Sequence, residues 1–197
     1  IAYSATGTIS GCLVEDCIIS GEDYVAGIVS MHTTVSDCHV IGCTITSSDS
    51  AGGIEGYLYY RDKGKVISGC TVANCTILAA ERAGGILSRA DMTSRNGSST
   101  YVISDCTTTN NTITATNTYT EEITNPADVT GYVGGIVGHG SNGTILACEA
   151  QNTVTGFRAG GIAGSESYIL QSCISSGSVY GVYSAGGIAG CAASSVD

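Results

Sequence analysis

Apolar and polar residues alternate in short segments along the whole chain, and Gly, Asn or Asp separates one segment from the next. Alternation with a period of two is the pattern of a β-strand that buries one face. No window carries the i, i+3, i+4 apolar pattern of an amphipathic helix. The sequence therefore predicts short strands joined by tight turns, and little helix.

A unit of about 26 residues recurs six times along the chain, with part of a seventh at the end. Each unit contains a leading cysteine, and these are Cys12, Cys38, Cys70, Cys106, Cys148 and Cys173. Each also contains a Gly-Ile pair, whose glycines are Gly27, Gly53, Gly85, Gly135, Gly161 and Gly187. Such a period indicates a solenoid, in which units bury their apolar faces by stacking on one another.

Alignment on the leading cysteine shows what the neighbouring positions require. The position three residues before it is always apolar: Ile9, Val35, Ile67, Ile103, Ile145 and Leu170. The position four residues after it is occupied by Asp16, Gly42, Asn74, Asn110, Asn152 and Gly177. All six tolerate a left-handed backbone, so we expect a tight corner there in every unit.

Short strands, sharp corners and this period predict an all-β fold, a right-handed parallel β-helix of about seven coils. Each coil would add one rung of about 4.8 Å along the axis. A β-propeller is the alternative, but its blades need about 40 residues each. We expect a single domain over residues 1–197, and because the chain opens inside the repeat, we expect it to be a piece of a longer protein.

Three insertions interrupt the repeat, at residues 55–65, 88–100 and 114–131. The first two leave consecutive coils at the same corner, so we expect them to lie side by side and form a ledge. The third leaves from a different side and contains the single proline, Pro126.

The predicted ledge gathers most of the basic residues and several tyrosines. Its candidate ligand-binding residues are Tyr57, Tyr59, Tyr60, Arg61, Lys63, Lys65, Arg89 and Arg95. Aromatic faces stack on sugars or pack in interfaces, and cations attract anionic groups, so the expected partner is an acidic glycan or a host or bacterial surface protein. Two alternatives stay open: charges excluded from the core collect in loops, or the ledge contacts Glu121 and Glu122 of the third insertion.

The 197 residues include 28 Gly, and the formal net charge is −10. A negative chain is a poor partner for nucleic acid or for an anionic membrane surface. No apolar run reaches the 18 residues or so that a membrane span needs, so membrane insertion is not expected. Exposed end rungs are templates for pairing, and end-to-end self-association is a further expectation.

The ten cysteines allow three interpretations: metal ligands, disulfides, or buried thiols. A second cysteine follows the first as Cys17, Cys43 and Cys75, but Asn111, Thr153 and Ser178 follow in the next units. Residues that do not bind zinc argue against a metal site. Stacked side chains that point the same way are poorly oriented for a disulfide. Two interior ladders of reduced thiols are therefore favoured, with Cys191 outside them.

The segments AGGIEG (51–56), AGGILS (83–88), GGIVGHG (134–140) and AGGIAG (159–164 and 185–190) resemble the GLUG-motif repeats of bacterial surface proteins. Similar repeats occur in adhesin-like proteins and in the repeat region of some immunoglobulin-A-cleaving metalloproteases. The resemblance implies a secreted or surface-displayed bacterial protein with a β-helical stalk or adhesive segment. It implies no catalytic residue, and the metalloprotease H-E-x-x-H motif is absent from this sequence.

The expected function is a non-enzymatic adhesive or structural module without a metal or cofactor. The alternative is a polysaccharide lyase or hydrolase, since β-helices also carry such enzymes. These enzymes need paired carboxylates, or Ca²⁺ ligands with a basic residue. Asp62 and Asp91, one coil apart, are the nearest candidates.

Overall fold

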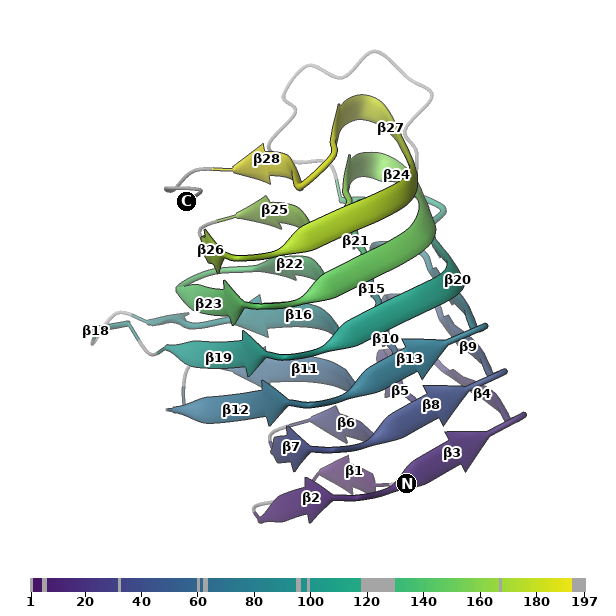
Figure 1. Ribbon diagram of the computed structural model, residues 1–197, viewed down its shortest axis with the longest axis vertical. Coiled ribbons are helices and arrows are strands. Elements are labelled where there is room, and N and C mark those ends of the chain that lie inside the picture. Colours follow the sequence, from purple (N-terminus) through teal and green to yellow (C-terminus); the bar gives the residue numbers. More distant parts are fainter. Residues whose placement is uncertain are drawn as a thin grey trace.

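The computed structural model describes residues 2–4, 7–31, 33–59, 61, 64–94, 97–98, 100–117, 130–166 and 168–192. It is a right-handed parallel β-helix whose coils rise from the N-terminus to the C-terminus (Figure 1). Equivalent strands of successive coils pair in parallel, in three sheets that we name A, B and C. The predicted fold class is confirmed.

In sheets A and B, each successive coil contributes one strand. Sheet A comprises β1 (Ala2–Ser4), β6 (Val29–Met31), β11 (Glu55–Tyr59), β16 (Leu87–Asp91), β22 (Val137–Gly140), β25 (Ala163–Glu166) and β28 (Ala189–Ala192). Sheet B comprises β2 (Thr8–Ser10), β7 (Thr34–Ser36), β12 (Lys65–Ser68), β19 (Tyr101–Ser104), β23 (Gly143–Leu146) and β26 (Tyr168–Gln171).

Sheet C covers the rest of each coil and is built from three rows of strands. The first row is β3 (Leu13–Glu15), β8 (His39–Ile41) and β13 (Thr71–Ala73). The second is β4 (Ile18–Gly21), β9 (Thr44–Ser47) and β14 (Thr76–Ala79). The third is β5 (Tyr24–Ala26), β10 (Ser50–Gly52), β15 (Arg82–Gly84) and β21 (Tyr132–Gly134). In later coils the rows merge into the long strands β20 (Thr107–Ala115), β24 (Glu149–Gly160) and β27 (Ile174–Gly186).

The core consists of columns of like residues that stack from coil to coil. The column three residues before the leading cysteine is one of them, with Val35, Ile67 and Ile103 fully buried and in register. Val40 and Val72, two residues after the leading cysteine, form another. Stacking buries the inward face of each coil, as the alternating pattern predicted.

The predicted corner is present in most coils. Asp16, Gly42, Asn74 and Asn110 have φ between 51° and 65°, and Gly177 has a φ of 108°. A second left-handed corner, which the alignment did not single out, lies immediately before the leading cysteine. It is formed by Gly11, Asp37, Gly69, Asp105, Ala147 and Ser172, with φ between 50° and 61°. The Gly and Asp residues at this position were the available sequence signal.

Asn152 does not form the predicted corner, because its coil is one residue shorter there. β20 and β24 pair through Thr109 with Gln151 and then through Thr112 with Thr153. Two residues of β20 therefore lie opposite Asn152 alone, and β24 continues through the corner as a strand. For the same reason Thr153 matches Thr112, and not the second-cysteine position to which the alignment assigned it.

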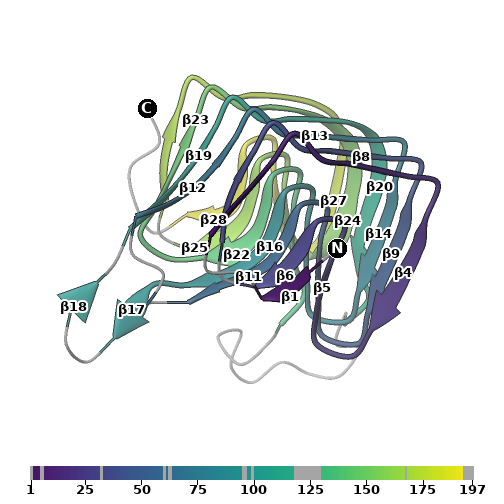
Figure 2. The same cartoon turned by 90° about the horizontal axis from the view of Figure 1, so that it is seen from below.

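The Gly-Gly-Ile motif forms a corner that folds inward between the third row of sheet C and sheet A (Figure 2). A Cβ atom on Gly84 would overlap the carbonyl oxygen of Leu87, because sheet A turns back across this position. A Cβ atom on Gly85 would overlap the carbonyl oxygen of Gly135 in the next coil. Neither oxygen belongs to a flexible side chain, so both positions require glycine. We call this turn the inner corner.

Candidate functional site: the ledge and the inner corner

The first two predicted insertions leave the rod from neighbouring strands. β11 and β16 pair in parallel, with Tyr57 opposite Arg89 and Tyr59 opposite Asp91. The first part of each insertion is thus strand, and the extra residues follow Tyr59 in one coil and Asp91 in the next. The second insertion includes the antiparallel hairpin of β17 (Thr93–Ser94) and β18 (Gly97–Ser98), which projects from the rod (Figure 2).

Tyr57 lies at the base of the ledge and is packed rather than presented to solvent. Its residue exposure is only 8%, and its ring stacks on Tyr24 with 4.3 Å between ring centroids. Its hydroxyl donates a hydrogen bond of 3.0 Å to Oδ2 of Asp91. Burial, together with the negative charge of Asp91, raises the pKa of Tyr57 above its ordinary value. Tyr57 therefore anchors β11 against its neighbours.

Arg89 also belongs to this packed base. Its Nη2 lies 2.7 Å from Oδ2 of Asp91, and its guanidinium carbon lies 5.5 Å from the centroid of the Tyr57 ring. Burial by itself would lower the pKa of Arg89, but the adjacent Asp91 carboxylate outweighs it and leaves this pKa raised. Arg89 stays charged, and Asp91 offsets much of the positive potential that we expected from it.

The other described ledge residues lie further out. Arg61 is exposed, and Lys65 is half-buried at the start of β12. Tyr59 is half-buried and tilts against Tyr57, with 5.9 Å between centroids. Several residues of the predictions lie outside the described residues: Tyr60, Asp62, Lys63, Arg95, Glu121, Glu122 and Pro126.

The inner corner holds a set of ring and cation contacts that the alignment missed. The ring of His139 lies 4.6 Å from that of Tyr132. Arg158 Nη1 donates to the Tyr132 hydroxyl at 2.8 Å, and its guanidinium carbon lies 5.3 Å from the Tyr132 and Tyr183 ring centroids. His139 is in register with Arg89, so these contacts continue the packing at the base of the ledge. The signal was available, since Tyr132 and Arg158 both stand three residues before the second glycine of the motif.

All ten cysteines are free thiols in the structure, and six of them are buried. Nine of the ten occupy two columns in the places that the repeat predicted. Cys38 and Cys75 each donate a hydrogen bond of 3.2 Å to the carbonyl oxygen two residues earlier. Burial raises the pKa of both thiols. Cys191 is exposed and pairs in register with Ser165 of sheet A, away from both columns.

Asparagine continues the second cysteine column in the later coils. The backbone N–H of Cys43 points to Cys75 Sγ at 3.3 Å, whereas the N–H of Cys75 donates to Asn111 Oδ1 at 2.8 Å. The N–H of Asn111 donates in turn to Asn152 Oδ1 at 3.2 Å. The column is therefore a ladder of side-chain acceptors for backbone N–H groups, and Asn152 is its next member.

Within the residues that the structure describes, no group of three or more His, Cys, Asp and Glu side chains is placed to hold a metal ion. His39 is half-buried, and its Nδ1 lies 2.6 Å from the hydroxyl of Thr71. The same described part of the chain contains no helix long and apolar enough to cross a bilayer.

No protein-family model matches this sequence, and no curated protein matches it. A solved structure from Bacteroides ovatus, described as a "putative immunoglobulin A1 protease", is similar in fold, with a TM-score of 0.65 and 19% sequence identity. The similarity covers 94% of this chain and 59% of that one, so this chain spans about three fifths of the neighbour. At this identity the likeness shows the fold alone, which is that of the rod described above.

Proposed function

We propose that this chain is a non-enzymatic β-helical repeat module of a secreted or surface-displayed bacterial protein, and that it contacts its partner through the ledge. The observation that carries the proposal is the pairing on both sides of the two insertions. Tyr59 lies opposite Asp91 where the chain leaves sheet A, and Lys65 lies opposite Tyr101 where it re-enters sheet B. Two long insertions therefore begin and end on adjacent rungs of a stacked scaffold.

The packed base supports this role because it fixes the points from which the insertions depart. Tyr57, Arg89 and Asp91 form a stacked and ion-paired cluster that joins consecutive coils. A binding surface carried by loops on a rigid scaffold is a common arrangement in proteins. Similarity of the AGGI segments to GLUG repeats supports the same class of protein.

The proposed partner is an acidic glycan or an acidic patch on a surface protein. Among the residues that the structure describes, Arg61 and Lys65 are the cations that would contact this partner. The sequence places Lys63 and Arg95 in the same two insertions. On a chain of net charge −10, such a cluster would direct anionic groups to the ledge. We do not assign this contact to Tyr57 or Arg89, whose polar groups already bind Asp91.

Binding to an array of acidic and neutral glycans, at low and at high salt, tests the proposal. The double variant Arg61→Gln, Lys65→Gln should lose about tenfold in affinity for the acidic ligand at low salt. Gln171→Glu, an exposed change on β26, adds negative charge away from the ledge and should leave affinity within about twofold. Ligand binding that withstands both the double variant and high salt would exclude the ledge. Cleavage of the bound glycan would instead support the enzyme alternative.

A further inference from the structure

The second row of sheet C presents an outer face made largely of threonine. Its inward positions, Ile45, Ile77 and Ile113, belong to the core, so the alternate residues point outward. One outward column, in register from coil to coil, is Ile18, Thr44, Thr76, Thr112, Thr153 and Ser178. The next is Ser20, Thr46, Leu78, Thr114, Thr155 and Tyr180. We call these two columns the threonine face.

The threonine face carries no charged side chain, although the chain as a whole has a net charge of −10. The later coils extend the uncharged region, because residues 106–117, 150–157 and 173–191 contain no Asp, Glu, Lys or Arg. Every residue of the first column is exposed. A surface of hydroxyl and methyl groups without charge has nothing to attract an ionic partner.

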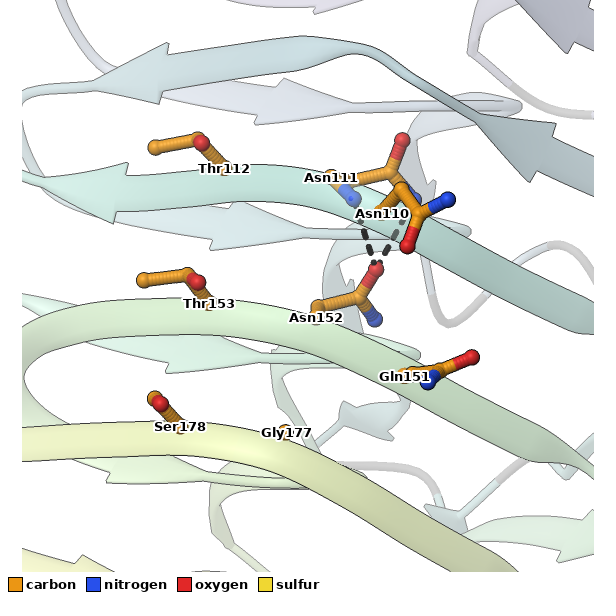
Figure 3. Close-up of a pocket in the computed structure, with 8 residues that line it drawn as sticks. All are labelled: Asn110, Asn111, Thr112, Gln151, Asn152, Thr153, Gly177 and Ser178. Atoms are coloured by element: carbon orange, nitrogen blue, oxygen red, sulfur yellow. Dashed lines mark hydrogen bonds between the residues drawn. The ribbon is translucent and has the colours of Figure 1, made fainter.

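A hollow of about 260 Å³ opens on the upper part of this face (Figure 3). Its exposed rim is Asn110, Thr112, Gln151, Thr153, Gly177 and Ser178, and its buried floor is Asn111 and Asn152. The hollow coincides with the place where the repeat changes length, since two residues of β20 lie opposite Asn152 alone. The next rung places Gly177, which has no side chain, in register with Asn152.

The floor of the hollow is already hydrogen-bonded, while its rim offers uncharged donors and acceptors. Asn111 Nδ2 donates to Asn152 Oδ1 at 2.9 Å, and Asn152 Nδ2 donates to the Thr108 hydroxyl at 2.7 Å. On the rim, the amides of Asn110 and Gln151 each supply both a donor and an acceptor, and the hydroxyls add more. Paired donors and acceptors of this kind suit the adjacent hydroxyls of a sugar ring.

An exposed aromatic ring lies beside the hollow. Tyr180 follows Ser178 by two residues in β27, so it stands on the same face, and it is 63% exposed. An exposed ring next to uncharged hydrogen-bonding groups can stack on the apolar face of a sugar while the polar groups bind its edge.

We propose that the threonine face binds a neutral polysaccharide that lies along the axis of the rod, with one sugar unit in the hollow and Tyr180 stacked on an adjacent unit. The rungs repeat every 4.8 Å or so, a distance comparable with one pyranose unit in an extended chain, so a polymer would meet an equivalent pair of residues at each coil. The absence of charge on this face selects a neutral chain over an acidic one. The site lies on sheet C, apart from the ledge, and does not depend on it.

Affinity gel electrophoresis of the full chain in soluble polysaccharides tests the proposal. The neutral probes are xylan, mixed-linkage β-glucan and galactomannan, and the acidic probe is polygalacturonate. At least one neutral polymer should retard the protein, equally at low and high salt. Thr153→Lys, which fills the hollow, and Tyr180→Ala should each weaken this retardation about tenfold. Gln171→Lys is the control, because it places the same charged side chain at an exposed position of sheet B, off the threonine face, and it should cost less than about twofold.

Circular dichroism and thermal unfolding should be the same for all three variants, since the altered side chains are exposed. Retardation by no neutral polymer would overturn the proposal, as would retardation that Thr153→Lys and Tyr180→Ala leave unchanged. Sedimentation that shows a dimer which Thr153→Lys dissociates would assign the face to contacts between copies instead. The ledge variant Arg61→Gln, Lys65→Gln should retain neutral binding, so the two proposals can fail separately.

Discussion

The earlier and later coils of the rod turn the same corner in different ways. In the earlier coils, β8 and β9 are separate strands joined through Gly42, and the thiol of Cys43 faces the N–H of Cys17 at 3.4 Å. In the later coils, β24 runs unbroken from Glu149 to Gly160, and asparagine oxygens replace the thiols as acceptors.

Both halves place a side-chain acceptor at this position for a backbone N–H group of the preceding coil. A thiol sulfur is a weak acceptor and an amide oxygen is a stronger one. The amide also donates, so Asn111 reaches the carbonyl oxygen of Val72 at 2.9 Å as well. The inner corner is built alike in both halves, with glycine against a carbonyl oxygen of the next coil. The repeat therefore requires glycine at the inner corner, whereas the corner at Gly42 and Asn152 tolerates a change of length and of residue type.

The largest effect should come from the inner corner that both halves share. Gly53→Ala in the earlier coils and Gly135→Ala in the later coils would each place a Cβ against a carbonyl oxygen of the next coil. Each should lower the free energy of unfolding by about 4 kcal/mol, measured by chemical denaturation. Gly187→Ala is the control, since its Cβ would contact nothing within 4 Å, and it should stay within about 0.5 kcal/mol. A loss at Gly53 alone would contradict a common corner.

The asparagine ladder should be the next most sensitive feature. Asn111→Leu leaves the Cys75 N–H and the Val72 carbonyl without the partner that the Asn111 side chain provides, and should cost about 3 kcal/mol. Asn111→Cys restores the earlier type of ladder and should cost about half as much. Thr112→Val, on the exposed neighbour, should change stability by less than about 0.5 kcal/mol. Equal losses for Leu and Cys would show that the thiols do not act as acceptors.

Alkaline pH should separate the thiol and amide ladders. The raised pKa of Cys38 and Cys75 means that the unfolded chain releases these protons first, so stability should fall above about pH 8.5. Each such thiol contributes up to about 1.4 kcal/mol per pH unit. Cys75→Ala should flatten the fall, whereas Asn152→Ala should lower stability without changing its slope. Thermal unfolding of both variants from pH 7 to pH 10 measures how steeply stability falls with pH. A fall that is equally steep in Cys75→Ala and in the unchanged protein would show that the Cys75 thiol does not cause it.

The smallest effect should come from the single hydrogen bond that Tyr57 donates at the base of the ledge. Tyr57→Phe removes the hydrogen bond to Asp91 but keeps the stack on Tyr24, and should cost about 1 kcal/mol. Tyr57→Ala removes the stack as well and should cost about 3 kcal/mol. Similar values for the two variants would mean that the ring contributes little, and that the corner is fixed by its glycines alone.

Much of the fold was readable from the chain because the repeat aligns with itself. Corner residues such as Gly42 and Asn74 predict a left-handed backbone, and recurring apolar residues such as Val35 and Ile67 predict the core. The alignment erred at Asn152, because a shift of one residue inside a repeat cannot be seen until strands are paired. It also presented Tyr57 as a free aromatic ring, since sequence gives no measure of what lies across a corner.

The sequence by itself determined the period, the stacking direction of the apolar columns and the places where the repeat is interrupted, because these depend on spacing along the chain. Tertiary structure alone decided that sheet A folds back against the third row of sheet C, which brings Tyr24 to Tyr57 and His139 to Tyr132. It also decided where the hollow lies, because that depends on the register between β20 and β24. Contacts between residues distant in sequence follow from register and corner angle, which no local pattern encodes.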